Sequence, residues 1–322
     1  MAQAQGVIPM TTHFSLGKGL AAGIAATLLA ACEQAPSTTS DAAELRVDGS
    51  STVFPLTREA ARRFERGALS GQIEVKFSGT AAGFRRFCAA ETDISNASRE
   101  INAEELAQCQ ANGVEFRAVP LAMDAIAVVV NPANTWVDEI SVDELKKLWS
   151  PGAENTFNTW RDLREGWPNE PIVLFGRGQD SGTYDIFTQS IVGTTHSSRQ
   201  DYQASEDEEF LANAIAAEPN ALGFFGIGAY HRHWDELKLV AVDAGHGAVF
   251  PTLETVAQDR YQPLTRPLFL YVSQRSLAEK PMLGRFLSHY LDGLPGWIHF
   301  TGYMPLARDS YRNSMQALGK AP

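Results

Sequence analysis

The sequence has few cysteines, little positive charge and none of the common catalytic signatures. Its three cysteines lack the spacing of a zinc site. Twenty-seven Lys and Arg residues stand against 38 Asp and Glu, for a formal net charge of −11. Such a surface repels nucleic acid and does not attract anions from a distance. Any anion site must therefore depend on hydrogen-bond donors held close to the ligand.

Catalytic and metal motifs are also missing. Ser181 lies in Gly178–Gly182, which does not match the Gly-x-Ser-x-Gly elbow of hydrolases, and there is no Gly-x-x-x-x-Gly-Lys-Ser/Thr loop. His231, His233 and His246 have no matching cysteine or carboxylate frame. We therefore expect no metal, no cofactor and no enzymatic activity. A histidine near Ser181 in space would leave a serine-dependent phosphoesterase as an alternative.

Strand-like and helix-like segments alternate after residue 44, which is typical of an α/β protein. With 44% apolar residues, the chain can form one large core or two of ordinary size. Asn102, Ser141 and Ser205 each precede a glutamate by three residues, which predicts three helix starts. The acidic run 206–209 then reads as the first turn of the third helix.

The first 31 residues have a pattern of their own. Lys18 precedes an apolar run of 13 residues, Gly19 to Ala31, and Cys32 follows directly. This run is too short to span a bilayer, and small residues before a lone cysteine resemble a bacterial lipoprotein export signal. We therefore expect residues 1–31 to be a signal peptide, starting at Met1 or Met10.

Export has consequences for the mature protein. Cys32 would carry the lipid, and residues 32–43, rich in Ser, Thr, Gln and Pro, would form a flexible tether. The protein would then lie in the periplasm or at the cell surface, touching the membrane only through its lipid. Cys88 and Cys109 are predicted to form a disulfide in this oxidising compartment.

Three segments share one pattern of strand, Gly/Ser/Thr turn and amphipathic helix. They are Leu45–Val53, Ile73–Gly83 and Ile172–Thr183. Helix starts offer N–H groups and a positive dipole end, hydroxyls add donors, and glycine lets an anion approach the backbone. One such turn means little, because these residues are common in loops. Three of them, one with Arg177 four residues before Ser181, indicate an oxyanion site.

Two apolar runs, Ala125–Val130 and Pro267–Val272, read as buried strands. If both cross between two lobes, the first lobe comprises 44–130 plus 265–322 and the second comprises 131–264. The two strands would form a hinge, with the first two turns on one side of a cleft and the third on the other. We expect the large aromatic residues between the runs to be core residues: Trp149, Trp160, Trp167, Phe224 and Phe225.

Five motifs follow one another along residues 44–310: Val47–Pro55, Ser78–Phe84, Asp93–Arg99, Gly176–Tyr184 and Asn220–Gly226. They resemble those of the periplasmic phosphate-binding proteins that supply the bacterial ABC phosphate importer, in the branch that carries a lipid. The resemblance implies a type II-like, two-lobe periplasmic binding protein fold. It also implies a ligand in the interlobe cleft, no catalysis, and inorganic phosphate as the cargo.

The resemblance also implies a set of phosphate ligands. The side chain of Arg177 would supply a planar fork that suits two phosphate oxygens. The remaining ligands implied by the motifs are Ser51 and Thr52 by hydroxyl, Val53 by its backbone N–H, Thr80, Ser181, Gly182 and Thr183.

One position departs from the family pattern. Many members place an aspartate, which accepts the proton of phosphate, where this chain has Ser98 followed by Arg99. Such an acceptor lets a site prefer protonated phosphate over sulfate. Ser98 can still accept one hydrogen bond, and Asp124 is a second candidate for the carboxylate. Arg99 could add positive charge to the anion site or form an interlobe salt bridge, and Asp124 could contact the ligand or cap a strand end.

We therefore expect a monomeric, extracytoplasmic protein that binds inorganic phosphate and delivers it to the permease subunits of an ABC importer. A binder or sensor of sulfate, arsenate or a phosphate ester is the alternative within the same fold.

Overall fold

The computed structural model describes residues 45–67 and 72–319. The predicted signal peptide, the predicted tether and Cys32 lie outside these residues. Among the helices that are described, none combines the length and apolar character needed to cross a bilayer. The described residues belong to the compact unit that begins at Ala42.

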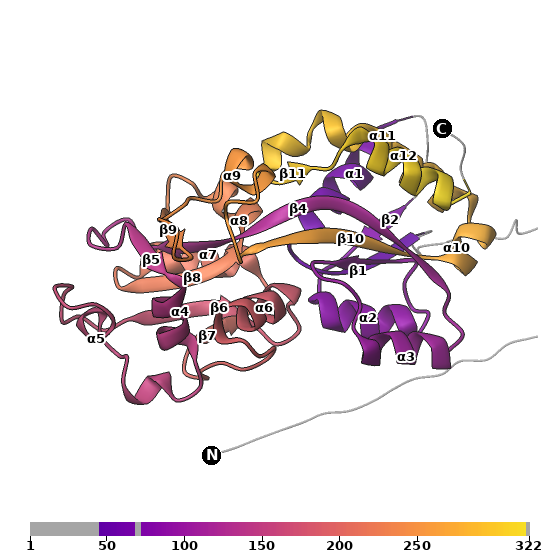
Figure 1. The fold of residues 1–322 in the computed structure, drawn as a ribbon. Helices are drawn as coiled ribbons and strands as arrows, with labels where there is room; N and C mark the ends of the chain where they lie inside the picture. Colours follow the sequence, from indigo (N-terminus) through magenta and orange to yellow (C-terminus); the bar gives the residue numbers. More distant parts are fainter. Residues whose placement is uncertain (1–44, 68–71, 320–322) are drawn as a thin grey trace, which may run out of the picture. The chain divides into compact units, whose positions relative to one another are not determined.

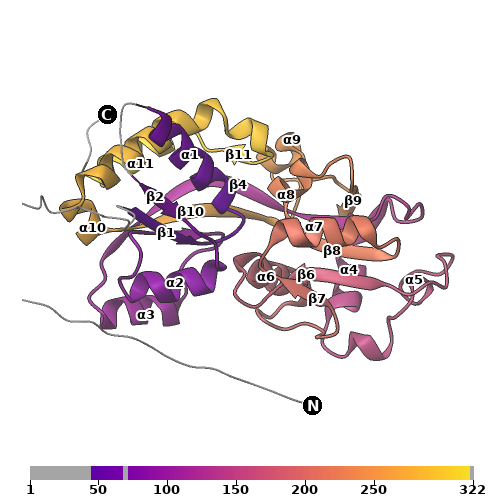
Figure 2. The ribbon, with the colours of Figure 1, turned by 180° about the vertical axis from the view of Figure 1, so that it is seen from behind.

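Two long strands organise this unit. The first part of β4 (Phe116–Val130) pairs antiparallel with β10 (Thr265–Ser273), and its last part pairs antiparallel with β8 (Ala221–Gly226). Figures 1 and 2 show β4 and β10 running between two groups of elements, which we call the first and the second lobe. The two apolar runs predicted to be buried strands lie in β4 and β10, so that prediction is confirmed.

The first lobe is a sheet with the order β2-β1-β3-β10-β4, in which β1 pairs parallel with β2 and β3. In Figures 1 and 2, α2 and α3 lie on one side of this sheet and α1, α11 and α12 on the other. Its other strands are β1 (Leu45–Gly49), β2 (Ile73–Val75), β3 (Ile94–Ala97) and β11 (Met304–Pro305). Its helices are α1 (Phe54–Arg66), α2 (Thr80–Cys88), α3 (Ala103–Ala111), α10 (Gln274–Glu279), α11 (Pro281–Gly293), η3 (Leu294–Gly296), η4 (Ile298–Thr301) and α12 (Arg308–Ala317).

The second lobe continues the sheet in the order β4-β8-β6-β7, and β9 also pairs with the end of β4. Its strands are β5 (Glu139–Ser141), β6 (Val173–Arg177), β7 (Gln203–Ser205), β8 and β9 (Lys238–Asp243). Its helices are α4 (Val142–Trp149), η1 (Ala153–Asn155), α5 (Trp160–Leu163), α6 (Gly182–Phe187), η2 (Thr188–Val192), α7 (Glu208–Ala217), α8 (Ile227–Arg232) and α9 (Leu253–Ala257).

A helix follows each of the three predicted turns, and its apolar face is buried as the spacing predicts. These residues are Leu56, Ala60, Ala61 and Phe64 on α1, Phe84, Phe87 and Cys88 on α2, and Tyr184 and Phe187 on α6. The predicted core aromatics are buried as well, Trp149 and Trp160 completely. Burial of these faces fixes the helix starts against the sheet edges, which is where the candidate site lies.

Two of the three predicted helix caps are confirmed. Asn102 and Ser141 each form a capping box with the glutamate three residues later. The prediction for Ser205 is wrong, because α7 begins after Asp207, whose carboxylate accepts the Glu209 N–H at 2.9 Å. Ser205 is the last residue of β7, and the side chain of Glu208 contacts Thr52 and Arg177 instead.

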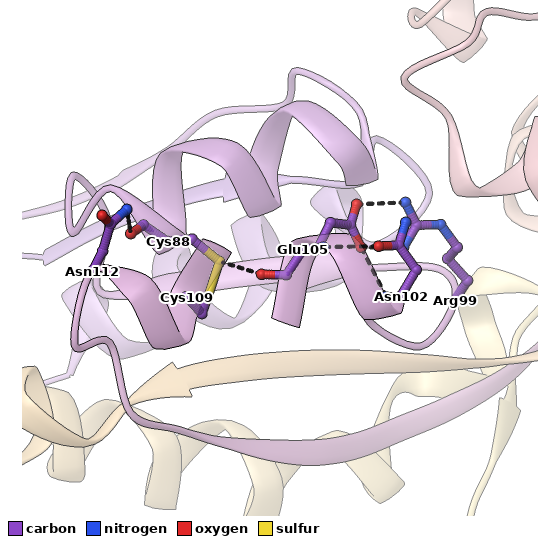
Figure 3. Close-up of a disulfide and its surroundings, with 6 residues drawn as sticks. All are labelled: Cys88, Arg99, Asn102, Glu105, Cys109 and Asn112. Atoms are coloured by element: carbon purple, nitrogen blue, oxygen red, sulfur yellow. Dashed lines mark hydrogen bonds and ion pairs between the residues drawn. A yellow bond between two sulfur atoms is a disulfide. The ribbon is translucent and has the colours of Figure 1, made fainter. Parts of the chain in front are cut away.

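A disulfide joins Cys88, at the end of α2, to Cys109 on α3 (Figure 3). Both cysteines are fully buried, and the Asn112 side chain donates to the carbonyl of Cys88 at 2.8 Å. Thr80 is the first residue of α2. The disulfide therefore fastens the far end of a helix whose start belongs to the candidate site.

Replacing both cysteines, as Cys88→Ala with Cys109→Ala, is expected to lower the free energy of unfolding by about 2 to 4 kcal/mol. The reason is that the bond closes a loop between residues 21 apart in the sequence and so restricts the unfolded chain. Urea denaturation at constant pH measures the change. Equal stability of the two proteins would show that α2 and α3 are held by packing alone.

Candidate functional site

The three turns meet where the two lobes touch. Ser50 to Val53 connect β1 to α1, and Thr80 begins α2, both in the first lobe. In the second lobe, β6 ends at Arg177 and α6 begins at Gly182. Hydroxyls from opposite lobes approach each other, with 3.4 Å between the Oγ1 atoms of Thr52 and Thr183. The residues predicted as ligands are thus brought together from positions more than 100 apart in the chain.

Two glycines lie at the contact between the lobes. Gly79 has φ of +92°, and a Cβ there would lie 2.5 Å from the backbone oxygen of Asp180. The Ala81 N–H donates to that oxygen at 3.0 Å. A Cβ on Gly182 would lie 2.7 Å from the Ser98 Oγ. A side chain at either glycine would therefore keep the lobes apart.

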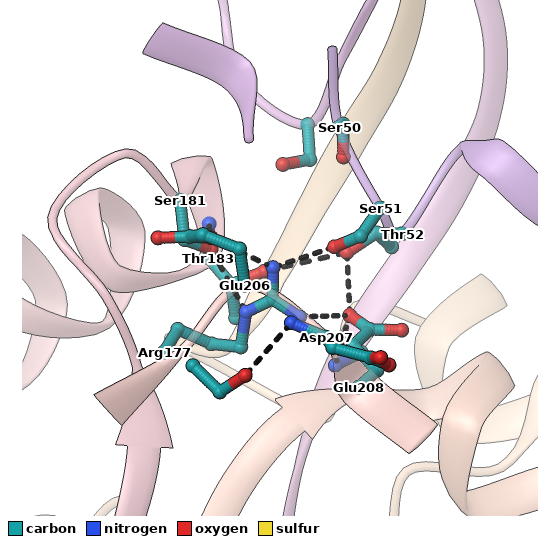
Figure 4. A network of polar contacts seen from close by, with 12 residues as sticks. Ser50, Ser51, Thr52, Arg177, Ser181, Thr183, Glu206, Asp207 and Glu208 are labelled. Atoms are coloured by element: carbon teal, nitrogen blue, oxygen red, sulfur yellow. Dashed lines mark hydrogen bonds and ion pairs between the residues drawn. The ribbon is translucent and has the colours of Figure 1, made fainter. Parts of the chain in front are cut away.

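Arg177 is the central cation of the site and is only 1% exposed (Figure 4). Its Nη2 donates to Ser51 Oγ at 2.5 Å across the lobe boundary, and its Nε donates to Ser181 Oγ at 3.1 Å. Two carboxylates balance its charge: Glu206 lies 3.0 Å from Nη2, and Glu208 lies 3.2 Å from Nη1. Burial raises the pKa of Glu206, although Arg177 acts against the increase.

The remaining predicted ligands lie within this cluster or beside it. The Thr80 Oγ1 is 3.1 Å from the Ser98 Oγ, and the Ser98 N–H donates to the same Thr80 atom at 3.3 Å. The Thr183 N–H donates to the Ser181 Oγ at 3.1 Å. The Val53 N–H points to Ser50 Oγ at 3.4 Å, a long bond that leaves this donor weakly held.

Arg99 forms an interlobe salt bridge, which is one of the two roles that the sequence suggested for it. Its guanidinium pairs with Glu105 of its own lobe at 2.7 Å and with Asp185 of the second lobe. Burial alone would lower the pKa of Arg99, but the two carboxylates raise it above its ordinary value. Arg99 therefore pairs with carboxylates of both lobes and connects them, instead of adding its charge to the hydroxyl cluster.

Asp124 is fully buried, and its carboxylate is held by Arg266, with Nη2 at 2.7 Å and Nε at 2.9 Å from Oδ2. The other oxygen accepts the Ile227 N–H at 3.3 Å, at the start of α8. Burial raises the pKa of Asp124 to about 6, in spite of Arg266. The sequence suggested that Asp124 contacts the ligand or caps a strand end, and neither prediction included an ion pair with Arg266.

Sequence reasoning missed Glu206, Glu208 and Arg266. The two glutamates read as the polar first turn of a helix, but β7 pairs parallel with β6 and sets Ser205 opposite Arg177. The residues after Ser205 therefore reach the guanidinium. Arg266 is register partner of Asp124 in the antiparallel pair of β10 and β4. These contacts could be predicted only from the register of the paired strands, which a single sequence does not show.

A cavity of about 470 Å³ adjoins the cluster and includes Ser51 and Glu208 in its lining. Residues of both lobes line it, among them Phe54 and Arg58 of α1 and Arg232 of α8. The hydroxyl cluster is therefore next to an opening between the lobes. Chemically, the site offers hydroxyl and amide donors around one arginine, without a net excess of positive charge.

Comparison with known proteins agrees with this architecture. The family described as PBP superfamily domain matches residues 34–292. The chain is 42% identical to Protein SphX of Synechocystis sp., over 86% of this chain and 82% of that protein. It is 30% identical to the phosphate-binding protein PstS of Staphylococcus haemolyticus, over 86% of this chain and 85% of that protein.

Solved structures show the same relationship. A possible phosphate-binding protein from Planctomyces limnophilus is 35% identical, with a TM-score of 0.61 over 85% of this chain and 97% of the other. A putative phosphate ABC transporter substrate-binding protein from Clostridium perfringens, solved with bound phosphate, is 24% identical and shares the fold, with a TM-score of 0.68 over 82% and 99% of the chains. The chain has the two-lobe binding-protein fold, and it belongs to the PBP superfamily, in the family that contains SphX and the PstS phosphate-binding proteins.

Proposed function

We propose that this protein captures inorganic phosphate outside the cytoplasm and delivers it to an ABC-type importer. The names of its relatives support phosphate as the ligand. The observation in the molecule that carries the proposal is the meeting of hydroxyls from two lobes. Ser51 and Ser181 both accept from Arg177, and the Thr52 and Thr183 hydroxyl oxygens approach to 3.4 Å. No catalytic step is part of the proposal.

The geometry supports binding by neutral donors. Ser51 and Ser181 each accept a hydrogen bond from Arg177, so the hydrogens of both hydroxyls are free to point at a ligand. Arg177 supplies the positive charge, and Glu206 and Glu208 beside it leave the site without a net positive charge. Buried, fixed donors can replace the hydration of an anion without a net positive field. Contacts with both lobes would then favour the closed arrangement.

The ligand set that we propose is the one implied by the sequence motifs: Ser51, Thr52, Val53, Thr80, Ser98, Arg177, Ser181, Gly182 and Thr183. We further propose that Cys32 carries a lipid, that the permease subunits of the importer are the partner, and that the protein works as a monomer. The lobe limits 44–130 plus 265–322 and 131–264 belong to the same proposal.

Calorimetry of the full chain with phosphate, arsenate and sulfate tests the function. We expect phosphate to bind with micromolar affinity or better, which is about −8 kcal/mol. Arsenate, which has the same shape and protonation, should compete for the site. Absence of any heat with phosphate, together with binding of another oxyanion, would contradict the proposal. Hydrolysis of a phosphoester that is lost in Ser181→Ala would favour the phosphoesterase alternative.

A further inference from the structure

We propose that Glu208 turns the Thr52 hydroxyl into a proton acceptor, so that the site prefers an oxyanion that still carries a proton. The inference rests on the proposed phosphate function and extends it to the choice among oxyanions. Glu208 would act through Thr52, as a positioning residue, and would thereby replace the carboxylate that is absent at Ser98.

The hydrogen bonds of Thr52 determine which way its hydroxyl points. Its Oγ1 lies 2.7 Å from Glu208 Oε1 and 3.3 Å from Arg266 Nη2 (Figure 4 shows the contact with Glu208). A guanidinium can only donate, so Thr52 accepts from Arg266. A hydroxyl has one hydrogen and two acceptor positions. If the hydrogen goes to Glu208, one acceptor position of Thr52 remains. The Thr183 Oγ1 lies 3.4 Å from it, longer than the roughly 2.5 to 3.0 Å of a normal O–H···O bond, so a ligand can replace this weak contact.

The Glu208 Oε1 is an acceptor. Besides Thr52, Nη1 of Arg177 lies 3.2 Å from it, and the Gly226 N–H donates to it at 3.4 Å. Three groups with hydrogens thus surround one oxygen atom. The hydrogen of Thr52 is therefore directed to Glu208 and away from the ligand.

Burial keeps this arrangement in place. Thr52 and Arg266 are 1% exposed and Glu208 is 3% exposed, so bulk water does not compete for their hydrogen bonds. Oε2 of Glu208 is buried and has no hydrogen-bond partner within residues 45–67 and 72–319. An unsatisfied buried carboxylate oxygen lowers stability, which is more consistent with a functional role than with a structural one.

The site consequently has two chemically different sides. Ser51 and Ser181 accept from Arg177 and offer hydrogens, whereas Thr52 donates to Glu208 and offers a lone pair. Monohydrogen phosphate matches both sides, because it has bare oxygens and one P–OH group. Sulfate has the same charge and shape but no hydrogen, so one of its oxygens would face the lone pair of Thr52.

Glu208→Gln and Glu206→Gln form a matched pair for the test. Each removes one carboxylate from Arg177, but only Glu208 bonds Thr52. Calorimetry with phosphate and with sulfate at slightly alkaline pH compares two dianions. We expect Glu208→Gln to reduce the ratio of phosphate to sulfate affinity about tenfold, because a neutral amide oxygen holds the Thr52 hydrogen less strongly than a carboxylate and lets the hydroxyl turn towards a bare ligand oxygen. Glu206→Gln should change both affinities by the same factor.

Thr52 provides a second test that does not depend on the stability of the Glu208 variant. Thr52→Val should weaken phosphate binding and leave sulfate binding unchanged or stronger, because it also removes the lone pair that faces a sulfate oxygen, and Thr52→Ser should retain the native preference. A native ratio in both Glu208→Gln and Thr52→Val would overturn the inference while phosphate binding by the native chain upholds the proposed function. Failure of the native chain to bind phosphate would overturn the function itself, and the inference with it.

Discussion

Arg177→Ala is expected to lower phosphate affinity at least about 100-fold, or about 2.7 kcal/mol. Hydrogen bonds to a charged group contribute about 1.5 to 3 kcal/mol each, and the guanidinium is the central cation of the site. Its removal also leaves Glu206 and Glu208 without their shared cation. Two unbalanced carboxylates would repel the incoming anion. Calorimetry with phosphate measures the loss.

Arg177→Lys should fall between the native chain and the alanine variant, because an ammonium keeps the charge but not the planar fork. Arg164→Ala is the matched control: Arg164 also pairs with a glutamate, Glu144, but through α4. That variant should bind phosphate as the native chain does. Native affinity in Arg177→Ala, with an unchanged melting temperature, would remove Arg177 from the ligand set.

Arg266→Ala is expected to lower the free energy of unfolding by about 3 to 5 kcal/mol at neutral pH, because it leaves the buried carboxylate of Asp124 without its cation. The loss should depend on pH. The pKa of Asp124 is about 6 in the folded protein, above the ordinary value for aspartate. The folded state thus binds more protons than the unfolded state between these values, and the contribution of Asp124 to stability falls as pH rises through that window.

Without Arg266 the pKa of Asp124 should rise further, so its carboxyl group would be neutral in mildly acidic solution. The loss of unfolding free energy in Arg266→Ala should therefore be smaller there than at neutral pH. Urea denaturation at pH values below and above this range measures the difference. Arg275→Ala, which breaks an exposed pair with Glu279, serves as the control and should change stability by about 0 to 1 kcal/mol at every pH. A loss in Arg266→Ala that is equal at all pH values would mean that Asp124 does not titrate there.

Much of the fold was predictable from local patterns. Helical spacing behind each turn identified buried positions such as Leu56 and Phe84, and the two apolar runs identified β4 and β10. Capping chemistry identified the starts of α3 and α4 through Asn102 and Ser141. These features were accessible because their determinants lie within a few residues of one another.

The partners of the charged groups were not accessible in this way. Glu206 reaches Arg177 because β6 and β7 pair in a particular register, and Arg266 meets Asp124 across 142 residues of sequence. Arg99 similarly finds Asp185 on the other lobe. Local sequence shows only that such residues are charged. Which charge neutralises which is decided by the tertiary arrangement, so the acidic run 206–209 looked like an ordinary helix start.

The continuity of β4 limits how this molecule can evolve. One strand carries side chains of both lobes, facing β10 in its first part and β8 in its last part. Deletion of a single residue in the middle would invert the alternation of side chains on one half relative to the other. A change of length in β4 is therefore expected to disturb both lobes, except at Leu121, where the pairing with β10 already accommodates one extra residue.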